Sequence, residues 1–157
     1  MPRHAVEFAH VLIAFFYVGA LLASHLNMLA VRRAASWAEK AALLAVNRRA
    51  SLFIGFPSLL LLGIVGNVLG MIAGYRMADT PTFRIGNGLW LVSVLVAAVL
   101  DLPVTTRLAA MSRAAAGNGG GEPVGWNSRV GQWRLGNALQ LLLFVVLLWF
   151  MAAPWHA

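Results

Sequence analysis

Four long apolar stretches, at residues 8–31, 51–75, 87–108 and 135–153, most constrain the fold of this chain. A helix needs roughly twenty predominantly apolar residues to cross the hydrocarbon of a bilayer, and each stretch is about that long. Within lipid the backbone must satisfy its own hydrogen bonds, which favours helices. The sequence therefore predicts an all-α fold, a four-transmembrane-helix bundle, as a single membrane domain over residues 1–157.

The composition agrees with a membrane protein and excludes several kinds of site. Hydrophobic residues make up 61% of the chain and the mean hydropathy is +0.78, which is not expected of a water-soluble enzyme with one buried core. The chain has no cysteine, so disulfides, thiolate nucleophiles, iron–sulfur clusters and thiolate zinc sites are excluded. Any metal must depend on histidine, methionine, carboxylate or neutral oxygen ligands.

Positive charge is distributed unevenly over the two sides of the predicted bundle. Of the twelve Lys and Arg residues, nine fall on the side of the first and third connectors and three, Arg3, Arg76 and Arg84, on the other. By the positive-inside rule the first side is cytoplasmic, so we expect both termini on the periplasmic side of a bacterial inner membrane. The net charge of +7 then orients the bundle, and no nucleic-acid partner is expected.

The connectors and prolines suggest further local features. Residues 34–46 are too short to span and predict an interfacial amphipathic helix on the inner surface. Residues 114–123 are rich in glycine and predict a flexible linker. Pro57 and Pro103 predict kinks in the second and third spans. Three small residues of span two predict close helix packing: Gly63, Gly66 and Gly70.

One polar layer is expected toward the inner side. It contains Asp101, Asn137 and Gln140, with Arg107 as a candidate partner for the acid. Asp101 is the only acid inside a span, and a charge in hydrocarbon is expensive unless it is paired or functional. It therefore either pins spans three and four together through an ion pair or hydrogen bond, or serves as a proton-relaying or ion-coordinating carboxylate.

A second polar layer, near the outer side, contains His10, Asn67, Asn87 and Trp90. His10 and Tyr17 are seven residues apart and share one face of span one. His10 is either a satisfied polar contact or a neutral imidazole ligand for haem iron or another metal. A pair of bis-histidine haems is excluded because His10 and His25 share one span and no other span carries a histidine. One haem b with a single histidine ligand remains open, and we take His10, Tyr17, Asn67 and Trp90 as the candidate cofactor-binding residues.

The order of several residues resembles a bacterial family of predicted four-helix integral membrane proteins of unknown function. The similarity covers nearly the whole chain and rests on loose motifs: His10-Val11-Leu12 with Tyr17 and Gly19, Leu102-Pro103 before Thr106-Arg107-Leu108, Arg129 with Gln132-Trp133-Arg134, and Met151 with Pro154.

That family is in turn distantly similar to the four-helix membrane protoporphyrinogen oxidases, which bind haem b through a histidine of the first helix. The matching residues are His10, Arg49, Pro57, Gly66 and the segment 133–137. Those enzymes carry a required lysine at the start of the third helix, where this chain has Arg84 as its nearest cation. The resemblance thus implies a porphyrin-facing His10 and leaves an enzymatic activity open.

These observations lead to three functional hypotheses. The first is a small inner-membrane protein that binds one haem b or porphyrin through His10, with a redox-linked role. The alternative is a non-enzymatic accessory or scaffold subunit, in contact with a membrane-protein partner or a second copy of itself. A proton-coupled carrier using Asp101 is the third, although four spans with one acid rarely form an alternating-access site without dimerising.

Overall fold

The computed structural model describes residues 3–119 and 121–152, and these residues form helices with no strand among them. Four helical runs are long and apolar enough to cross a membrane: Arg3–Arg33, Trp37–Ile72, Pro81–Gly117 and Trp126–Phe150. The four-span prediction is thereby confirmed. Residue 153, the expected end of span four, and Pro154 lie outside the described residues.

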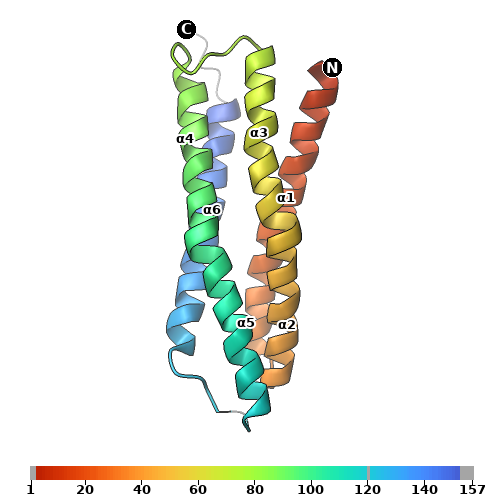
Figure 1. The fold of residues 1–157 in the computed structure, drawn as a ribbon, viewed down its shortest axis with the longest axis vertical. Helices are drawn as coiled ribbons and strands as arrows, with labels where there is room; N and C mark the ends of the chain where they lie inside the picture. Colours follow the sequence, from red (N-terminus) through yellow and green to blue (C-terminus); the bar gives the residue numbers. More distant parts are fainter. Residues whose placement is uncertain (1–2, 120, 153–157) are drawn as a thin grey trace.

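Two of the four runs are divided by a π turn. The elements are α1 (Arg3–Arg33), α2 (Trp37–Ala50), η1 (Ser51–Gly55), α3 (Phe56–Ile72), α4 (Pro81–Val96), η2 (Ala97–Asp101), α5 (Leu102–Gly117) and α6 (Trp126–Ala152). The four runs lie side by side, with α2 and α3 end to end in one of them and α4 and α5 end to end in another (Figure 1). We call the end with Arg3, the α3–α4 connector and the end of α6 the terminal end, and the opposite end the basic end.

Proline explains both π turns. Pro57 and Pro103 are each the second residue after a π turn. Proline has no backbone N–H, and its ring clashes with the carbonyl four residues earlier in an α-helix. The helix widens by one residue instead: the N–H of Phe56 donates to the carbonyl of Ser51, and the N–H of Leu102 donates to that of Ala97. The bends expected at the two prolines take this form.

The structure corrects the expectation for residues 34–46. Ser36 caps α2 by accepting a hydrogen bond of 3.2 Å from the backbone N–H of Glu39, and the helix then continues through η1 into α3. Instead of lying flat across the end of the bundle, as an interfacial helix would, α2 runs along the bundle and packs on α5 (Figure 1). The linker expected at 114–123 is also shorter, because α5 continues to Gly117.

The bundle has two apolar cores, one above the other. The core at the basic end joins α1, α2, α5 and α6 and consists of Met28, Val31, Leu44, Val104, Leu108, Ala109, Trp126 and Trp133. The second core joins α1, α3, η2 and α6 around Tyr17, Leu59, Leu62 and Ala97. η2 contributes Ala97 to the second core, and η1 joins α2, which packs in the first core, to α3, which packs in the second.

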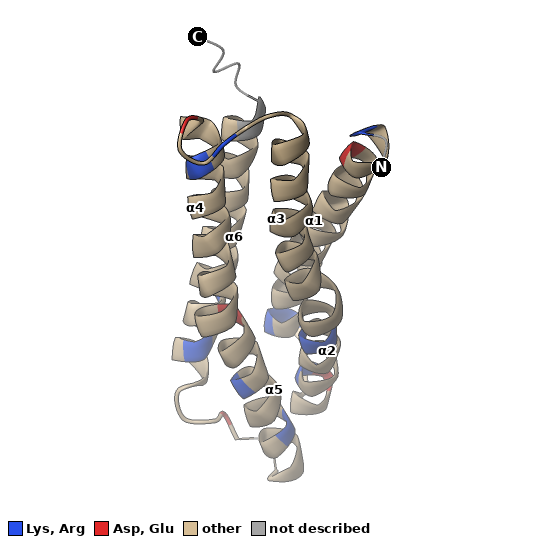
Figure 2. Cartoon of the chain, turned by 45° about the horizontal axis from the view of Figure 1, so that its top comes forward, with Lys and Arg blue, Asp and Glu red and all other residues tan. Residues whose placement is uncertain are grey.

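The basic residues gather toward one end of the bundle. The fold brings the α1–α2 and α5–α6 connectors together at the basic end, whereas Arg3, Arg76 and Arg84 lie at the terminal end (Figure 2). The Trp37–Ile72 run has 36 residues, about 54 Å of helix, against a hydrocarbon core of about 30 Å. We infer that α2 and α5, which carry the arginines, extend beyond the hydrocarbon at the basic end.

The sides of the helices are apolar and exposed, as lipid requires. The most exposed large side chains include Phe15, Phe53, Val99 and Trp149, each with at least 67% of its surface accessible. They belong to all four runs and face away from both cores. Together with the four spans, this surface identifies a multi-pass membrane protein whose outer face contacts lipid.

Candidate functional site

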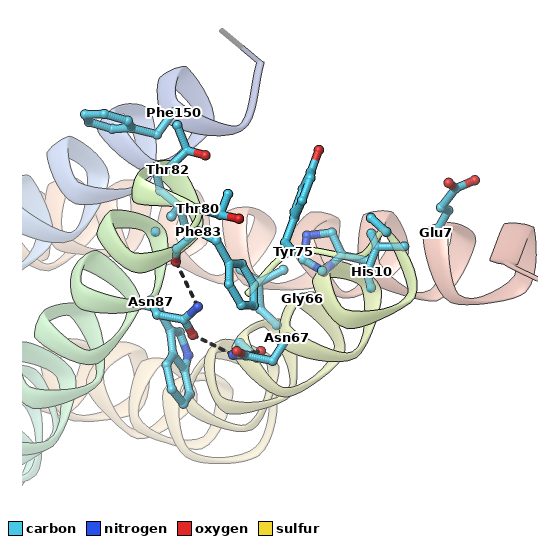
Figure 3. A pocket seen from close by; sticks show the side chains of 18 of the residues that line it. Glu7, His10, Gly66, Asn67, Tyr75, Thr80, Thr82, Phe83, Asn87 and Phe150 are labelled. Atoms are coloured by element: carbon cyan, nitrogen blue, oxygen red, sulfur yellow. Dashed lines mark hydrogen bonds between the residues drawn. The ribbon is translucent and has the colours of Figure 1, made fainter. Parts of the chain in front are cut away.

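A cavity of about 460 Å³ opens at the terminal end of the bundle. We call it the terminal cavity. Its walls come from the first turns of α1, the outer half of α3, the start of α4 and the end of α6 (Figure 3). Three of the four residues expected to bind a cofactor, His10, Asn67 and Trp90, line it. Its volume is in the range of small-molecule and cofactor sites, about 300–1,000 Å³.

Glycines of α3 make room for rings along one wall of the terminal cavity. A Cβ on Gly63 would overlap the indole of Trp90, and a Cβ on Gly70 would overlap the ring of Phe83. At Gly66, a Cβ would come within 3.1 Å of His10 Cε1. The glycines read from the sequence as sites of close helix packing therefore accommodate one imidazole and two aromatic side chains.

His10 is buried in this wall, with 8% of its surface accessible. Its Nδ1 atom is buried and has no hydrogen-bond partner, and the Cε1–Nδ1 edge of the ring faces Gly66. Since buried polar atoms are nearly always paired, an imidazole nitrogen packed against Gly66 without a partner is unusual. The expectation of a satisfied polar contact for His10 is not met at Nδ1.

Two asparagines link α3 to α4 across the cavity. Asn67 Nδ2 donates to Asn87 Oδ1 at 2.6 Å and to the carbonyl of Gly63 at 2.8 Å. Asn87 Nδ2 in turn donates to the carbonyl of Phe83 at 2.9 Å (Figure 3). The indole N–H of Trp90 donates to the carbonyl of Leu59 at 2.8 Å, so α3 and α4 are held together by side chains that belong to the cavity wall.

Charge at the terminal cavity is confined to its mouth. Arg3 Nε donates to Glu7 Oε1 at 2.7 Å, and both residues line the opening. His4 Nδ1 lies 3.1 Å from Glu7 Oε2. Of the described residues that line the cavity, Arg3 is the only Lys or Arg. An exposed pair of this kind contributes little to stability. The Arg3 guanidinium can therefore exchange Glu7 for an anionic group of a ligand at little cost.

Tyr17, the fourth expected cofactor residue, lies elsewhere. It lines a smaller cavity of about 50 Å³ at the level of the two π turns, which we call the central cavity. Seven helical residues separate it from His10 by about 10 Å along the axis, so a shared face does not mean a shared site. The phenol donates a hydrogen bond of 2.8 Å to Gln140 Oε1.

The central cavity is surrounded by a polar network that joins α1, α4 and α6. Gln140 Nε2 donates to the carbonyl of Ser93 at 2.8 Å. Asn137 Nδ2 donates to Ser24 Oγ at 3.0 Å, and the Trp133 indole N–H donates to the same oxygen at 3.3 Å. Gln140, Asn137 and Trp133 are each at most 4% accessible. The sequence predicted the amides of Asn137 and Gln140 as polar residues of this layer. It did not indicate that Ser24 would accept hydrogen bonds from both Asn137 and Trp133.

Asp101 is part of this network without the partner expected for it. Its Oδ1 atom is buried and has no hydrogen-bond partner, and the described residues contain no ion pair to it. The carboxylate packs against Gly136 of α6, where a Cβ would overlap Oδ1. Arg107 is exposed and does not line the central cavity. The described residues thus provide no ion pair for Asp101, but Gln140 of α6 hydrogen-bonds to its carboxylate, which is the other form of the expected contact between spans three and four. Gly136 is a neighbour that sequence reasoning missed.

The comparisons with known proteins add no further constraint. No family model, curated protein or solved structure matches the chain. The arguments that follow therefore rest on the geometry of the two cavities.

Proposed function

We propose that this membrane protein binds one planar aromatic ligand, haem b or a porphyrin, in the terminal cavity, with His10 as the protein ligand. The observation that carries the proposal is the imidazole of His10, 8% accessible, on the wall of a cavity of about 460 Å³. A neutral imidazole is the usual haem ligand.

The remaining lining residues suit such a ligand. Trp90 and Phe83 supply aromatic surface, and the glycines of α3 keep the facing wall free of Cβ atoms. Arg3 is placed at the mouth, where a porphyrin propionate could replace Glu7 as its partner. An apolar wall with a few fixed polar groups is typical of small-molecule sites.

The cavity offers one strong iron ligand. Its described lining residues include no second histidine and no methionine, so His10 is the residue that would hold the iron of a haem. Arg84 is exposed and does not line the cavity, so no cation of α4 stands beside the proposed ligand. We therefore propose binding with a redox-linked role and no specific oxidation of a porphyrin substrate.

We also propose an orientation for the site. The gathering of basic residues at one end favours that end as cytoplasmic. In a bacterial inner membrane the terminal cavity would then open toward the periplasm, together with both chain termini.

The visible spectrum of protein purified from haem-sufficient cells tests the proposal. We expect a Soret band, and we expect His10→Ala to abolish it. His25→Ala is the matched control, because His25 lies on the same helix and is exposed, and it should leave the band unchanged. Haemin or protoporphyrin added to the apoprotein should quench tryptophan fluorescence, including that of Trp90, saturably in the wild type and not in His10→Ala.

Two results would reject the proposal. One is a wild-type protein that neither carries nor takes up porphyrin, and the other is a Soret band of equal intensity in His10→Ala. A cofactor-free protein that co-purifies at fixed stoichiometry with another membrane protein would favour an accessory or scaffold subunit instead.

A further inference from the structure

The central cavity collects oxygen-bearing side chains from all four helical runs. Tyr17 and Ser24 come from α1, Ser51 from η1, Asp101 and Thr105 from η2 and α5, and Asn137 and Gln140 from α6. The cavity measures about 50 Å³, which is room for one or two water molecules. A group of seven oxygen-bearing residues around so small a space is unusual at the centre of an apolar bundle.

The charge at this place is not balanced by the described residues. Asp101 Oδ1 is buried without a partner, and no Lys, Arg or His is among the described residues that line the cavity. A buried ionised carboxylate is too costly without a counter-charge. Either a proton or a cation must therefore neutralise Asp101.

Several oxygen atoms around the cavity keep free lone pairs. Tyr17 donates its proton to Gln140, and Thr105 donates to the carbonyl of Asp101 at 2.8 Å, so both hydroxyl oxygens keep lone pairs. Asn137 donates through Nδ2 to Ser24, which leaves its amide oxygen to accept. Free oxygen acceptors around one carboxylate are the ligands that a hard cation prefers.

We propose that the central cavity binds one monovalent cation of the size of Na⁺, with Asp101 as its charged ligand. The described residues contain no group of three His, Cys, Asp or Glu side chains, so the site supplies one negative charge, which matches a monovalent ion better than a divalent one. Neutral oxygens of Tyr17, Thr105 and Asn137 complete the surroundings. This site is independent of the terminal cavity and of any porphyrin.

Binding would connect three of the four runs at the level of the π turns. A cation held between α1, η2, α5 and α6 stabilises the folded state by an amount that grows with the logarithm of the cation concentration above its dissociation constant, and it leaves the unfolded chain unaffected. Na⁺ should therefore raise the melting temperature of the detergent-solubilised protein more than K⁺ or choline does at equal ionic strength.

The test is a set of melting curves in about 100 mM NaCl, KCl or choline chloride at one neutral pH. If the dissociation constant for Na⁺ is about 1 mM, we expect a melting temperature roughly 8 °C higher in NaCl than in choline chloride. Asp101→Asn, which preserves shape and removes the charge, should abolish the difference. Asp79→Asn is the matched control, because Asp79 is exposed in the α3–α4 connector, and it should retain the difference.

An infrared difference spectrum keeps the proposal testable if Asp101→Asn does not fold. Exchange of choline for Na⁺ on the wild-type protein should shift the bands of one ionised carboxylate. Equal melting temperatures in the three salts would overturn the proposal, as would a carboxyl group that stays protonated in all of them, because Asp101 would then hold a proton. A sodium effect that persists in Asp101→Asn would overturn it as well.

Discussion

Replacement of Gly136 by alanine tests whether α6 is fitted to the Asp101 carboxylate. A Cβ at this position would overlap Asp101 Oδ1 and would lie 3.1 Å from Asp101 Cγ and 3.4 Å from Leu100 Cδ2. The backbone of a packed helix and a carboxylate on a short side chain leave little room for adjustment. Overpacking of this kind costs about 1–3 kcal/mol.

Gly131 of the same helix supplies the comparison. It is exposed, and a Cβ there would meet nothing within 4 Å. Both substitutions gain the helix propensity of alanine over glycine, up to about 1 kcal/mol, so the difference between the two variants isolates the steric cost. At about 3 °C per kcal/mol for a chain of this size, a cost of about 2 kcal/mol gives Gly136→Ala a melting temperature roughly 6 °C below that of Gly131→Ala.

The assay is thermal unfolding in detergent, followed by tryptophan fluorescence with circular dichroism as a second probe. Combining Gly136→Ala with Asp101→Ala completes a double-mutant cycle, and removal of the carboxylate should recover most of the steric loss. Equal melting temperatures for Gly131→Ala and Gly136→Ala would refute the close contact between η2 and α6. A cycle with no coupling would show that the loss comes from another neighbour.

Two further substitutions test the polar network around the central cavity and the apolar core at the basic end. Tyr17→Phe removes the hydrogen bond to Gln140 and should lower stability by about 0.6 kcal/mol, the average for hydrogen bonds between membrane helices, and by no more than about 1.7 kcal/mol. Tyr75→Phe, at an exposed tyrosine, should change it little, and equal losses would contradict the buried network. Leu44→Ala removes a side chain with no accessible surface from the core at the basic end and should cost about 2–5 kcal/mol in detergent melting. Val46→Ala, two residues away and 66% exposed, should cost far less, and a similar loss at both positions would argue against the packing of α2 on α5.

The four spans follow directly from the sequence, but the lengths of the helices do not. Hydropathy marks where apolar residues begin and end, and arginines at the basic end interrupt it at Arg48 and again at Arg107. The backbone has no reason to leave the helix there, because arginine is a good helix former. α2 and α5 therefore continue beyond the apolar stretches and support each other.

The terminal cavity could be anticipated better than the network around the central cavity. Depth along each span already grouped His10, Asn67, Asn87 and Trp90, since depth depends only on position in a helix. The rotation of a helix about its axis is harder to infer, and each π turn changes it. This is why Arg107 lies away from the polar network. It is also why nothing in the sequence indicated the contact between Asp101 and Gly136 apart from the presence of a small residue in α6.

The π turns also mean that each of the two runs that contain one presents a different side in its two halves. One residue of an α-helix corresponds to about 100° of rotation, so deletion of a single residue from η1 would turn α3 by that angle relative to α2. Gly63 and Gly66 would then leave Trp90 and His10, while the contacts of α2 with α5 would be preserved. The number of residues between α2 and the glycines of α3 thus fixes the rotation of the surface that packs on α5 relative to the surface that packs on Trp90 and His10. Single insertions or deletions near residue 53 should therefore be far more damaging than substitutions there.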